Sequence, residues 1–280
     1  MPSSGMSLVA SVIAQPRMTV GAVDVTWTEL ALAAVLVLMP IAISRWQQLG
    51  LARGFAIGAI RAVIQLLVVG YVLVYLFAVD RWYLVLLAIL VMLLAATKTA
   101  TDRQREARRT LFPIIGVALA VGAGLTLAYV DALVVRPGQW YDPRYLIPLF
   151  GMIVSNAMNA AALAAERLAS EIEARRGEVE AYLALGASPG QASGEAVRRS
   201  LVAALIPSVN GLTIVGLVSL PGMMTGQILA GSSPLLAVRY QLVVAFMLAG
   251  TTALTAVLAT LWYRRTFFTA AEQLAVRVPV

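Results

Sequence analysis

Long uninterrupted apolar runs constrain this chain more than any other feature of its sequence. A bilayer core is about 30 Å thick, so a helix needs roughly 20 apolar residues to cross it. Such runs recur along the 280 residues, of which 60% are hydrophobic and 12% are charged. Inside lipid every backbone polar group must be bonded within the protein, which leaves helices or closed barrels. Because the runs are continuous rather than alternating, they predict an all-α, polytopic integral membrane protein.

The runs predict about seven transmembrane helices. Their expected ranges are Trp27–Ser44, Phe55–Phe77, Trp82–Thr99, Leu111–Val130, Tyr145–Leu163, Leu201–Ala230 and Val238–Tyr263. The sixth range contains two prolines, so we expect it to be kinked or broken, and the sequence leaves that choice open. We divide the chain into an N-terminal tail (1–26), a transmembrane domain (27–265) and a C-terminal tail (266–280). The N-terminal tail lacks the basic start of a signal peptide, and we expect a short surface helix at Met6–Ala14.

The basic residues predict an orientation in the membrane. Loops on one side hold fifteen lysines and arginines, and loops on the other side hold five. The richer side is expected to be cytoplasmic, which puts the N-terminus outside and the C-terminus inside a bacterial inner membrane. The net charge of +7 is spread over several loops, so it indicates membrane orientation rather than nucleic-acid binding. The densest basic segment, Lys98–Arg109, is either a lipid-headgroup anchor or a contact with a partner protein.

Missing residue types exclude most enzyme classes. The chain has no histidine and no cysteine, so Ser–His and Cys–His nucleophiles and Cys/His zinc sites are excluded. Its only lysine, Lys98, has no phosphate-loop glycines before it, so the chain cannot bind ATP through that loop. All fourteen acidic residues fall in loops or near span ends, with Glu29, Asp131 and Glu166 closest to the membrane. Ion-coupled transport usually needs an embedded carboxylate, so we expect the energy for transport to come from a separate partner. Because the nucleophile and zinc sites are excluded, we also expect no catalytic residue in this chain.

The segment between the fifth and sixth spans predicts a docking helix for that partner. It runs from Glu166 to Ser200 and is mostly helix-forming. Gly186 can end the helix and Pro189 prevents its continuation, and a short amphipathic helix of this kind suits a groove in another protein. The alternative is a helix lying on the membrane, which its glutamates disfavour. The predicted docking residues are Glu178, Val179, Glu180, Ala181, Tyr182, Leu183, Leu185, Gly186 and Ala187, with Val179, Tyr182, Leu183 and Gly186 expected on one face.

The pattern Glu180-Ala181 followed by Gly186 resembles the Glu-Ala-Ala…Gly loop of ABC-transporter permeases, which forms the coupling helix that fits a cleft in the ATPase subunit. Further segments resemble the FetB/YbbM-type permeases: Leu49–Leu51, Arg61–Leu66, Pro148–Met152, Ser155–Asn159, Leu183–Ala187 and Gly216–Gly231. The resemblance implies a homodimeric permease working with two copies of a separate ATPase, which bind the ATP and Mg²⁺, whereas this chain holds no cofactor. It also implies iron export, with plant relatives linked to aluminium tolerance.

Polar side chains within the predicted spans suggest a substrate path. Polar residues in a bilayer helix either line such a path or bond a neighbouring helix, and a proline–glycine break either opens backbone carbonyls to a cavity or only kinks the helix. Arg61 either faces protein or water, or reaches the headgroups. The path residues are Arg61, Gln65, Met152, Ser155, Asn156, Asn159, Asn210, Pro221, Met223, Met224 and Gln227.

The substrate itself stays open at this stage. Iron(II) commonly takes imidazole, carboxylate or thiolate ligands, whereas this path offers thioether, amide, hydroxyl and backbone oxygen donors. Iron is therefore implied by the resemblance alone, and the substrate passes either as a metal ion or as a small complex. Two other functions stay open: an ion-coupled secondary transporter, and a membrane scaffold or receptor that transports nothing.

Overall fold

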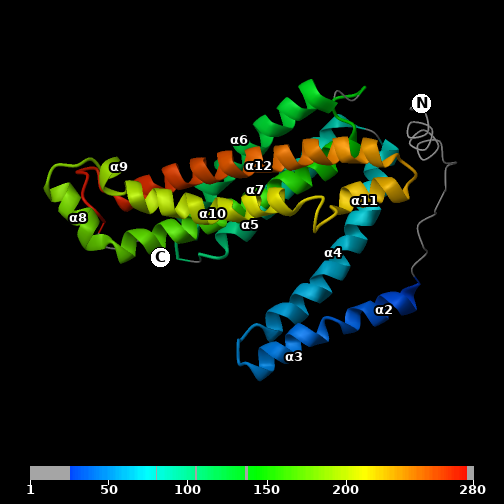
Figure 1. The fold of residues 1–280 in the computed structure, drawn as a ribbon, viewed down its shortest axis with the longest axis horizontal. Coiled ribbons are helices and arrows are strands. Elements are labelled where there is room, and N and C mark those ends of the chain that lie inside the picture. The colour runs from blue at the N-terminus through cyan, green and yellow to red at the C-terminus, as the bar shows by residue number, and fades with distance from the viewer. Residues whose placement is uncertain (1–25, 80, 105, 136–137, 276–280) are drawn as a thin grey trace, which may run out of the picture. The chain divides into compact units, whose positions relative to one another are not determined.

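The computed structural model describes residues 26–79, 81–104, 106–135 and 138–275, which form helices joined by short connections (Figure 1). These residues contain two isolated β-bridges and no strand, which confirms the all-α class. Residues 1–25 of the predicted N-terminal tail, including the surface helix at Met6–Ala14, lie outside the described residues.

The helices follow one another along the chain with few residues between them. In order they are α2 (Trp27–Val35), α3 (Leu38–Trp46), α4 (Ala52–Val79), α5 (Trp82–Thr101), α6 (Arg108–Tyr129), the π-helix η1 (Val130–Val135), α7 (Pro143–Ala174), α8 (Arg176–Ala184), α9 (Pro189–Ala192), α10 (Gly194–Ile214), α11 (Gly222–Leu229), α12 (Pro234–Arg264) and the 3₁₀-helix η2 (Arg265–Phe267).

Six helical segments of the described chain are long and apolar enough to cross a membrane. They are Trp27–Trp46, which joins α2 and α3, then Ala52–Val79, Trp82–Thr101, Arg108–Val134, Pro143–Ala174 and Pro234–Phe267. These confirm six of the expected spans. The remaining one, Leu201–Ala230, is not a continuous helix, because α10 ends at Ile214 and α11 begins only at Gly222. The sequence left open whether this range is kinked or broken, and the structure shows that it is broken.

A turn closed by its own hydrogen bonds causes that break. Gly216 has a φ of +82°, in the left-handed region that favours glycine. Its N–H donates to the carbonyl of Ser219 at 2.9 Å, and the N–H of Val218 donates to the carbonyl of Ile214 at 3.0 Å. Pro221, which has no N–H to donate, is the N-cap of α11. The interruption is thus a defined turn with bonded backbone groups.

The chain forms two compact units. The first comprises residues 26–75 and 220–240, and the second comprises the described residues of 76–219 and 241–275. In the second unit α7 packs against α5, α6 and α10. Ala160 and Ala164 of α7 meet Ala204 of α10 and Ala256 of α12 in one buried cluster. Small side chains let helix backbones approach closely in a membrane, which explains why this core is rich in alanine.

Candidate functional site

Two features of the second unit bring predicted site residues together. The first is the charged turn between α7 and α10, formed by residues 171–199, which we call the head. The second is a polar stripe on α7, formed by Met152, Ser155, Asn156 and Asn159. The first unit carries the remaining predicted path residues other than Asn210.

The head presents α8 as a short helix with a sharply defined end. Gly186 follows its C-cap Leu185 and has a φ of +88°. The N–H of Gly186 donates to the carbonyl of Leu183, and the N–H of Ala187 donates to the carbonyl of Tyr182, both at 3.0 Å. This pair of bonds is the Schellman motif. The motif favours glycine at this position, because glycine adopts the left-handed conformation without steric cost. The sequence prediction that Gly186 ends this helix is confirmed.

Side chains of α8 divide between an inner and an outer surface. Val179 is 2% exposed and packs into the head, and Leu183 is half-buried. Tyr182 is 49% exposed and Leu185 is 86% exposed, next to the exposed Gly186. The predicted common face of Val179, Tyr182, Leu183 and Gly186 is thus split, because α8 packs on one side against α9. We call the exposed apolar end, Tyr182–Gly186, the tip.

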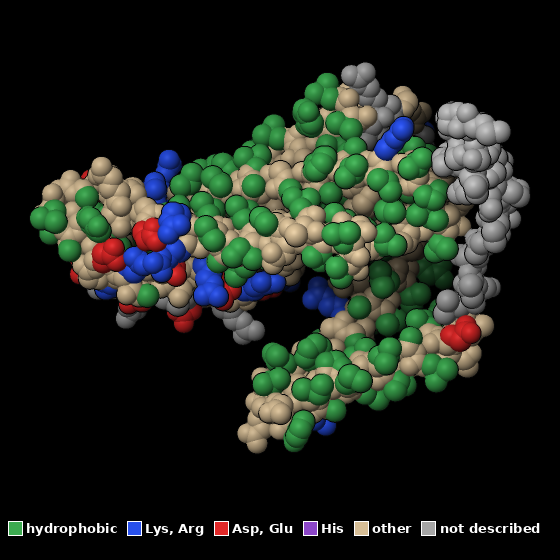
Figure 2. Space-filling model, in the orientation of Figure 1, with side chains coloured by type: hydrophobic (Ala, Val, Ile, Leu, Met, Phe, Trp, Pro, Cys, Tyr) green, Lys and Arg blue, Asp and Glu red, His purple; other side chains and the backbone are tan. Residues whose placement is uncertain are grey.

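Ion pairs hold α8 against the end of α7. Arg175 contacts Glu171 at 3.4 Å and Glu178 at 3.0 Å, and Arg176 contacts Glu173 and Glu180 at 3.3 Å each. Figure 2 shows acidic and basic side chains gathered at the end of the unit that carries α8. Exposed pairs contribute about 0–1 kcal/mol each, so they fix the angle of α8 more than they stabilise the fold. Glu178 and Glu180 are therefore engaged within the head.

The C-terminal segment closes the back of the head. Nη2 of Arg176 donates to the carbonyl of Ala275 at 3.3 Å. The N–H of Ala275 in turn donates to the carbonyl of Phe267 at 2.9 Å. Phe267 is fully buried and meets the ring of Tyr263 edge-on, with centroids 4.7 Å apart. This segment therefore connects α8 to the end of α12.

The start of α10 completes the head electrostatically. Hydrogen bonds from Arg198 and then Arg199 lower the pKa of the Glu195 carboxyl to about 2. Both guanidinium Nε atoms lie 2.8 Å from its oxygens. The carboxylate is fully ionised at neutral pH, and this part of the head keeps an excess of one positive charge.

The polar stripe on α7 points away from the core of its own chain. Ser155, Asn156 and Asn159 are exposed, whereas Ile153 and Ala157 are buried between them. Ser155 Oγ and Asn156 Nδ2 both donate to the carbonyl of Met152, at 3.1 Å and 2.9 Å. The stripe lies in a helix long enough to span a membrane, and an asparagine facing lipid there is costly. The stripe therefore needs water or another protein surface beside it.

A cation from another helix connection reaches the stripe. Nη2 of Arg103, which follows α5, donates to Oδ1 of Asn159 at 3.1 Å. Sequence reasoning assigned Arg103 only to a headgroup anchor or a partner contact, because nothing in a single sequence relates it to a residue 56 positions later. The structure adds Arg103 to the residues of the stripe.

Asn210 on α10 lies at a similar height to the stripe. The two helices run antiparallel (Figure 1), and Ala204 meets Ala160 in the alanine cluster. At 1.5 Å of rise per residue, Asn156 lies about 6 Å along α7 from Ala160, and Asn210 lies about 9 Å along α10 from Ala204. Both asparagines lie on the side of this alanine contact that is away from the head. Asn210 is also exposed. Two neighbouring helices thus carry exposed amides at one depth.

The first unit holds the other predicted path residues. Arg61 and Gln65 are exposed within this unit on α4. Met223 and Met224 are half-buried at the start of α11, and Oε1 of Gln227 is buried with no hydrogen-bond partner among the described residues. No three His, Cys, Asp or Glu side chains of the described residues lie close enough together to hold a metal ion.

Comparisons with known proteins extend these observations. The signature of the "Uncharacterised protein family (UPF0014)" matches residues 27–268. The chain is 40% identical over 253 residues to the "Probable iron export permease protein FetB" of Escherichia coli, covering 90% of this chain and 96% of that protein. It is 37% identical over 248 residues to "Protein ALUMINUM SENSITIVE 3" of Arabidopsis thaliana, covering 89% of each chain. It is 41% identical over 242 residues to the "UPF0014 membrane protein STAR2" of rice, covering 86% and 84%. No solved structure matches it significantly.

Proposed function

Because this chain is a multi-pass membrane protein of the UPF0014 family, we propose that it is the permease subunit of an ATP-driven exporter whose ATPase is a separate protein. The observation that carries the proposal is the tip of α8. A side chain as apolar as Leu185 stands 86% exposed at the end of a helix, and that helix is fixed by a Schellman turn and four ion pairs. A rigid apolar protrusion suits insertion into a complementary groove.

The route of coupling follows from the contacts of the head. When ATP closes the two ATPase subunits, a force on the tip passes through Val179 and the ion pairs into the end of α7. It also passes through Arg176 to the segment after α12. Because α7 carries the polar stripe, this motion would alter the path directly. ATP and Mg²⁺ belong to the ATPase, and this chain supplies the path.

The exposed stripe supports a second copy of the permease. Ser155, Asn156 and Asn159 lie outside the core of their own chain, so pairing two chains would enclose two stripes around one polar cavity. One tip per chain would then engage one ATPase subunit. We place the N-terminus outside and the C-terminus in the cytoplasm, since the tip must bind the ATPase on the side of the membrane where ATP is present.

Iron, or a related metal or metal complex, is the proposed substrate. Support comes from the relative in Escherichia coli, whose name describes iron export. The stripe offers amide and hydroxyl oxygens and one thioether, which bind iron weakly compared with imidazole or carboxylate. Weak ligands suit a path from which the substrate must be released.

A single substitution at the tip tests the proposal. Leu185→Asp puts a charge where an apolar groove is expected, so the permease should no longer co-purify with a co-expressed ABC ATPase from the same organism, and metal-stimulated ATP hydrolysis should be lost. Ala271→Asp adds the same charge at an exposed position after η2, outside the head, and serves as the control. Unchanged binding of the ATPase by the Leu185→Asp protein would refute docking through the tip.

A further inference from the structure

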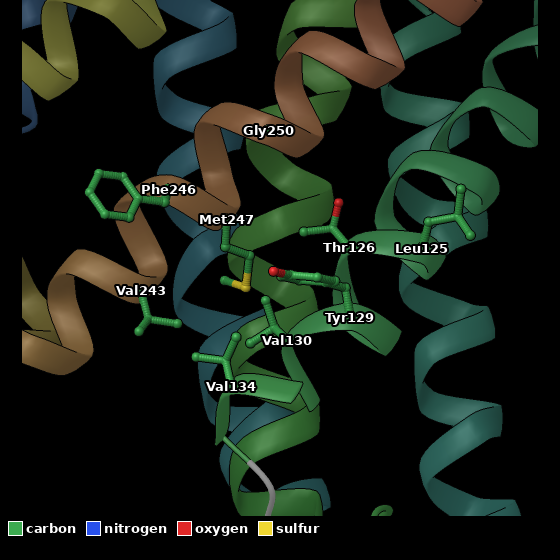
Figure 3. Close-up of a pocket in the computed structure, with 9 residues that line it drawn as sticks. All are labelled: Leu125, Thr126, Tyr129, Val130, Val134, Val243, Phe246, Met247 and Gly250. Atoms are coloured by element: carbon green, nitrogen blue, oxygen red, sulfur yellow. The ribbon is translucent and has the colours of Figure 1, made fainter. Parts of the chain in front are cut away.

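A groove lies between α6 with η1 on one side and α12 on the other, at the end of the unit away from the head (Figure 3). Its volume is about 800 Å³. One wall includes Tyr129, Val130 and Val134, and the other includes Val243, Phe246 and Met247. None of these residues belongs to the polar stripe or to the head.

The helix packing explains why the groove exists. Deeper in the unit, α6 and α12 touch at Gly122 and Thr255, where the Cβ of Thr255 lies 3.3 Å from the position that a Cβ on Gly122 would take. Because the helices are antiparallel, moving along α6 toward Val134 corresponds to moving back along α12 toward Val243. Over this stretch the groove lies between the two helices, and α6 continues as the π-helix η1. π-helical turns are rare and are found frequently at functional sites.

The side chains that line the groove favour an apolar ligand. All but two of its residues are apolar or glycine, and those two, Thr126 and Tyr129, carry only hydroxyl groups. A site with so few polar partners does not hold ordered water well, and an empty groove would forfeit dispersion contacts along both walls. Among the described residues no charged side chain lines it, so they offer no partner to a metal ion or a charged solute.

The position of the groove in the membrane points to lipid. Both walls belong to candidate membrane spans, Arg108–Val134 and Pro234–Phe267. Phe246 is 66% exposed and Tyr129 is 60% exposed, so apolar surface of the groove is open on two segments that are long and apolar enough to cross a membrane. We propose that it is a binding site for one acyl chain of a membrane phospholipid. The headgroup would lie toward Val134, the end of the span, where the bilayer interface is expected.

Photo-labelling of the permease in nanodiscs tests this site. The probe is a phosphatidylcholine with a diazirine midway along one acyl chain, and labelled peptides are quantified by mass spectrometry. We expect residues 125–134 and 243–250 to carry at least fivefold more label than lipid-exposed peptides elsewhere. Gly250 lines the groove with nothing within 4 Å of an added Cβ, so Gly250→Leu should fill it and lower that label severalfold. Gly124→Leu adds the same side chain at an exposed, open position outside the groove and should leave the label unchanged.

Even labelling of the whole surface, or label that Gly250→Leu does not reduce, would overturn the proposal. The other occupant to test is a second copy of this chain. Since the sequence has no cysteine, Phe246→Cys gives a unique thiol. Efficient coupling of two chains by a short bis-maleimide would place protein in the groove and overturn the lipid site, whereas strong lipid label without coupling supports it. Neither readout requires transport, so the outcome is independent of the proposed export function.

Discussion

The guanidinium of Arg103 donates a hydrogen bond to the side-chain oxygen of Asn159 at 3.1 Å, joining the connection after α5 to the polar stripe of α7. Both side chains are exposed, so the bond adds little to stability, about 1 kcal/mol or less. The bond places the positive charge of Arg103 beside the amide and hydroxyl groups of the stripe. If the substrate passes along the stripe, as we propose, a charge in that place affects transport more than it affects folding.

Removal of this cation should therefore separate activity from stability. We expect Arg103→Ala to change metal-stimulated ATP hydrolysis of the reconstituted complex severalfold while the melting temperature shifts by only a few degrees. Arg109→Ala removes the same charge from the same basic segment, at an exposed residue for which no contact with the stripe is found, and should retain activity. Equal losses for both variants would mean that only the total charge of the segment matters.

Asn156 tests whether the stripe lines the substrate path. Asn156→Leu removes an exposed amide that bonds only to its own helix, at the carbonyl of Met152, so the fold should be kept. We expect metal-dependent ATP hydrolysis to disappear, while ATPase binding remains. Thr99→Val is the matched control, because Thr99 is also exposed and bonds only to its own helix, at Ala95. Full activity of the Asn156→Leu protein would exclude this residue from the path.

The contact between α6 and α12 should tolerate no added methyl group. A Cβ at Gly122 would overlap the side-chain oxygen of Thr255. Overpacking of this kind costs about 1–3 kcal/mol, so Gly122→Ala should lower the thermal midpoint in detergent by several degrees. Gly124→Ala, two residues along the same helix and with nothing within 4 Å, should be neutral or slightly stabilising. Equal thermal midpoints for the two variants would show that α6 and α12 do not approach closely at Gly122.

The Schellman turn at the end of α8 gives a backbone test of the docking helix. Gly186 has a φ of +88°, and an L-residue in the left-handed region costs about 1–2 kcal/mol. Gly186→Ala should therefore loosen the tip and weaken ATPase binding, measured as a raised Kd in a titration with the purified ATPase. Gly177→Ala lies within α8, where φ is not positive, and should bind normally. Equal affinity for both variants would show that docking does not need a rigid tip.

Local sequence patterns were enough to predict much of the protein. Runs of about 20 apolar residues identify membrane helices because the bilayer sets their length, and six of them are present. Gly186 and Pro221 mark the ends of helices because their backbone restrictions act locally, whatever surrounds them. The short helix that ends at Gly186 was predicted for the same reason, since a glycine end is a local signal, whereas its docking role stays a prediction.

Tertiary structure decided which sides of these helices meet. Val179 and Tyr182 have similar places in the sequence pattern, yet Val179 is buried and Tyr182 is exposed, because the packing of α8 against α9 covers one side of the helix. Arg103 reaches Asn159 across 56 positions, and the groove opens only where α6 and α12 separate beyond Gly122 and Thr255. In lipid every face of a spanning helix is apolar enough to be exposed, so hydrophobicity alone does not select the packed one. That selection depends on close packing between particular side chains, which a single sequence does not reveal.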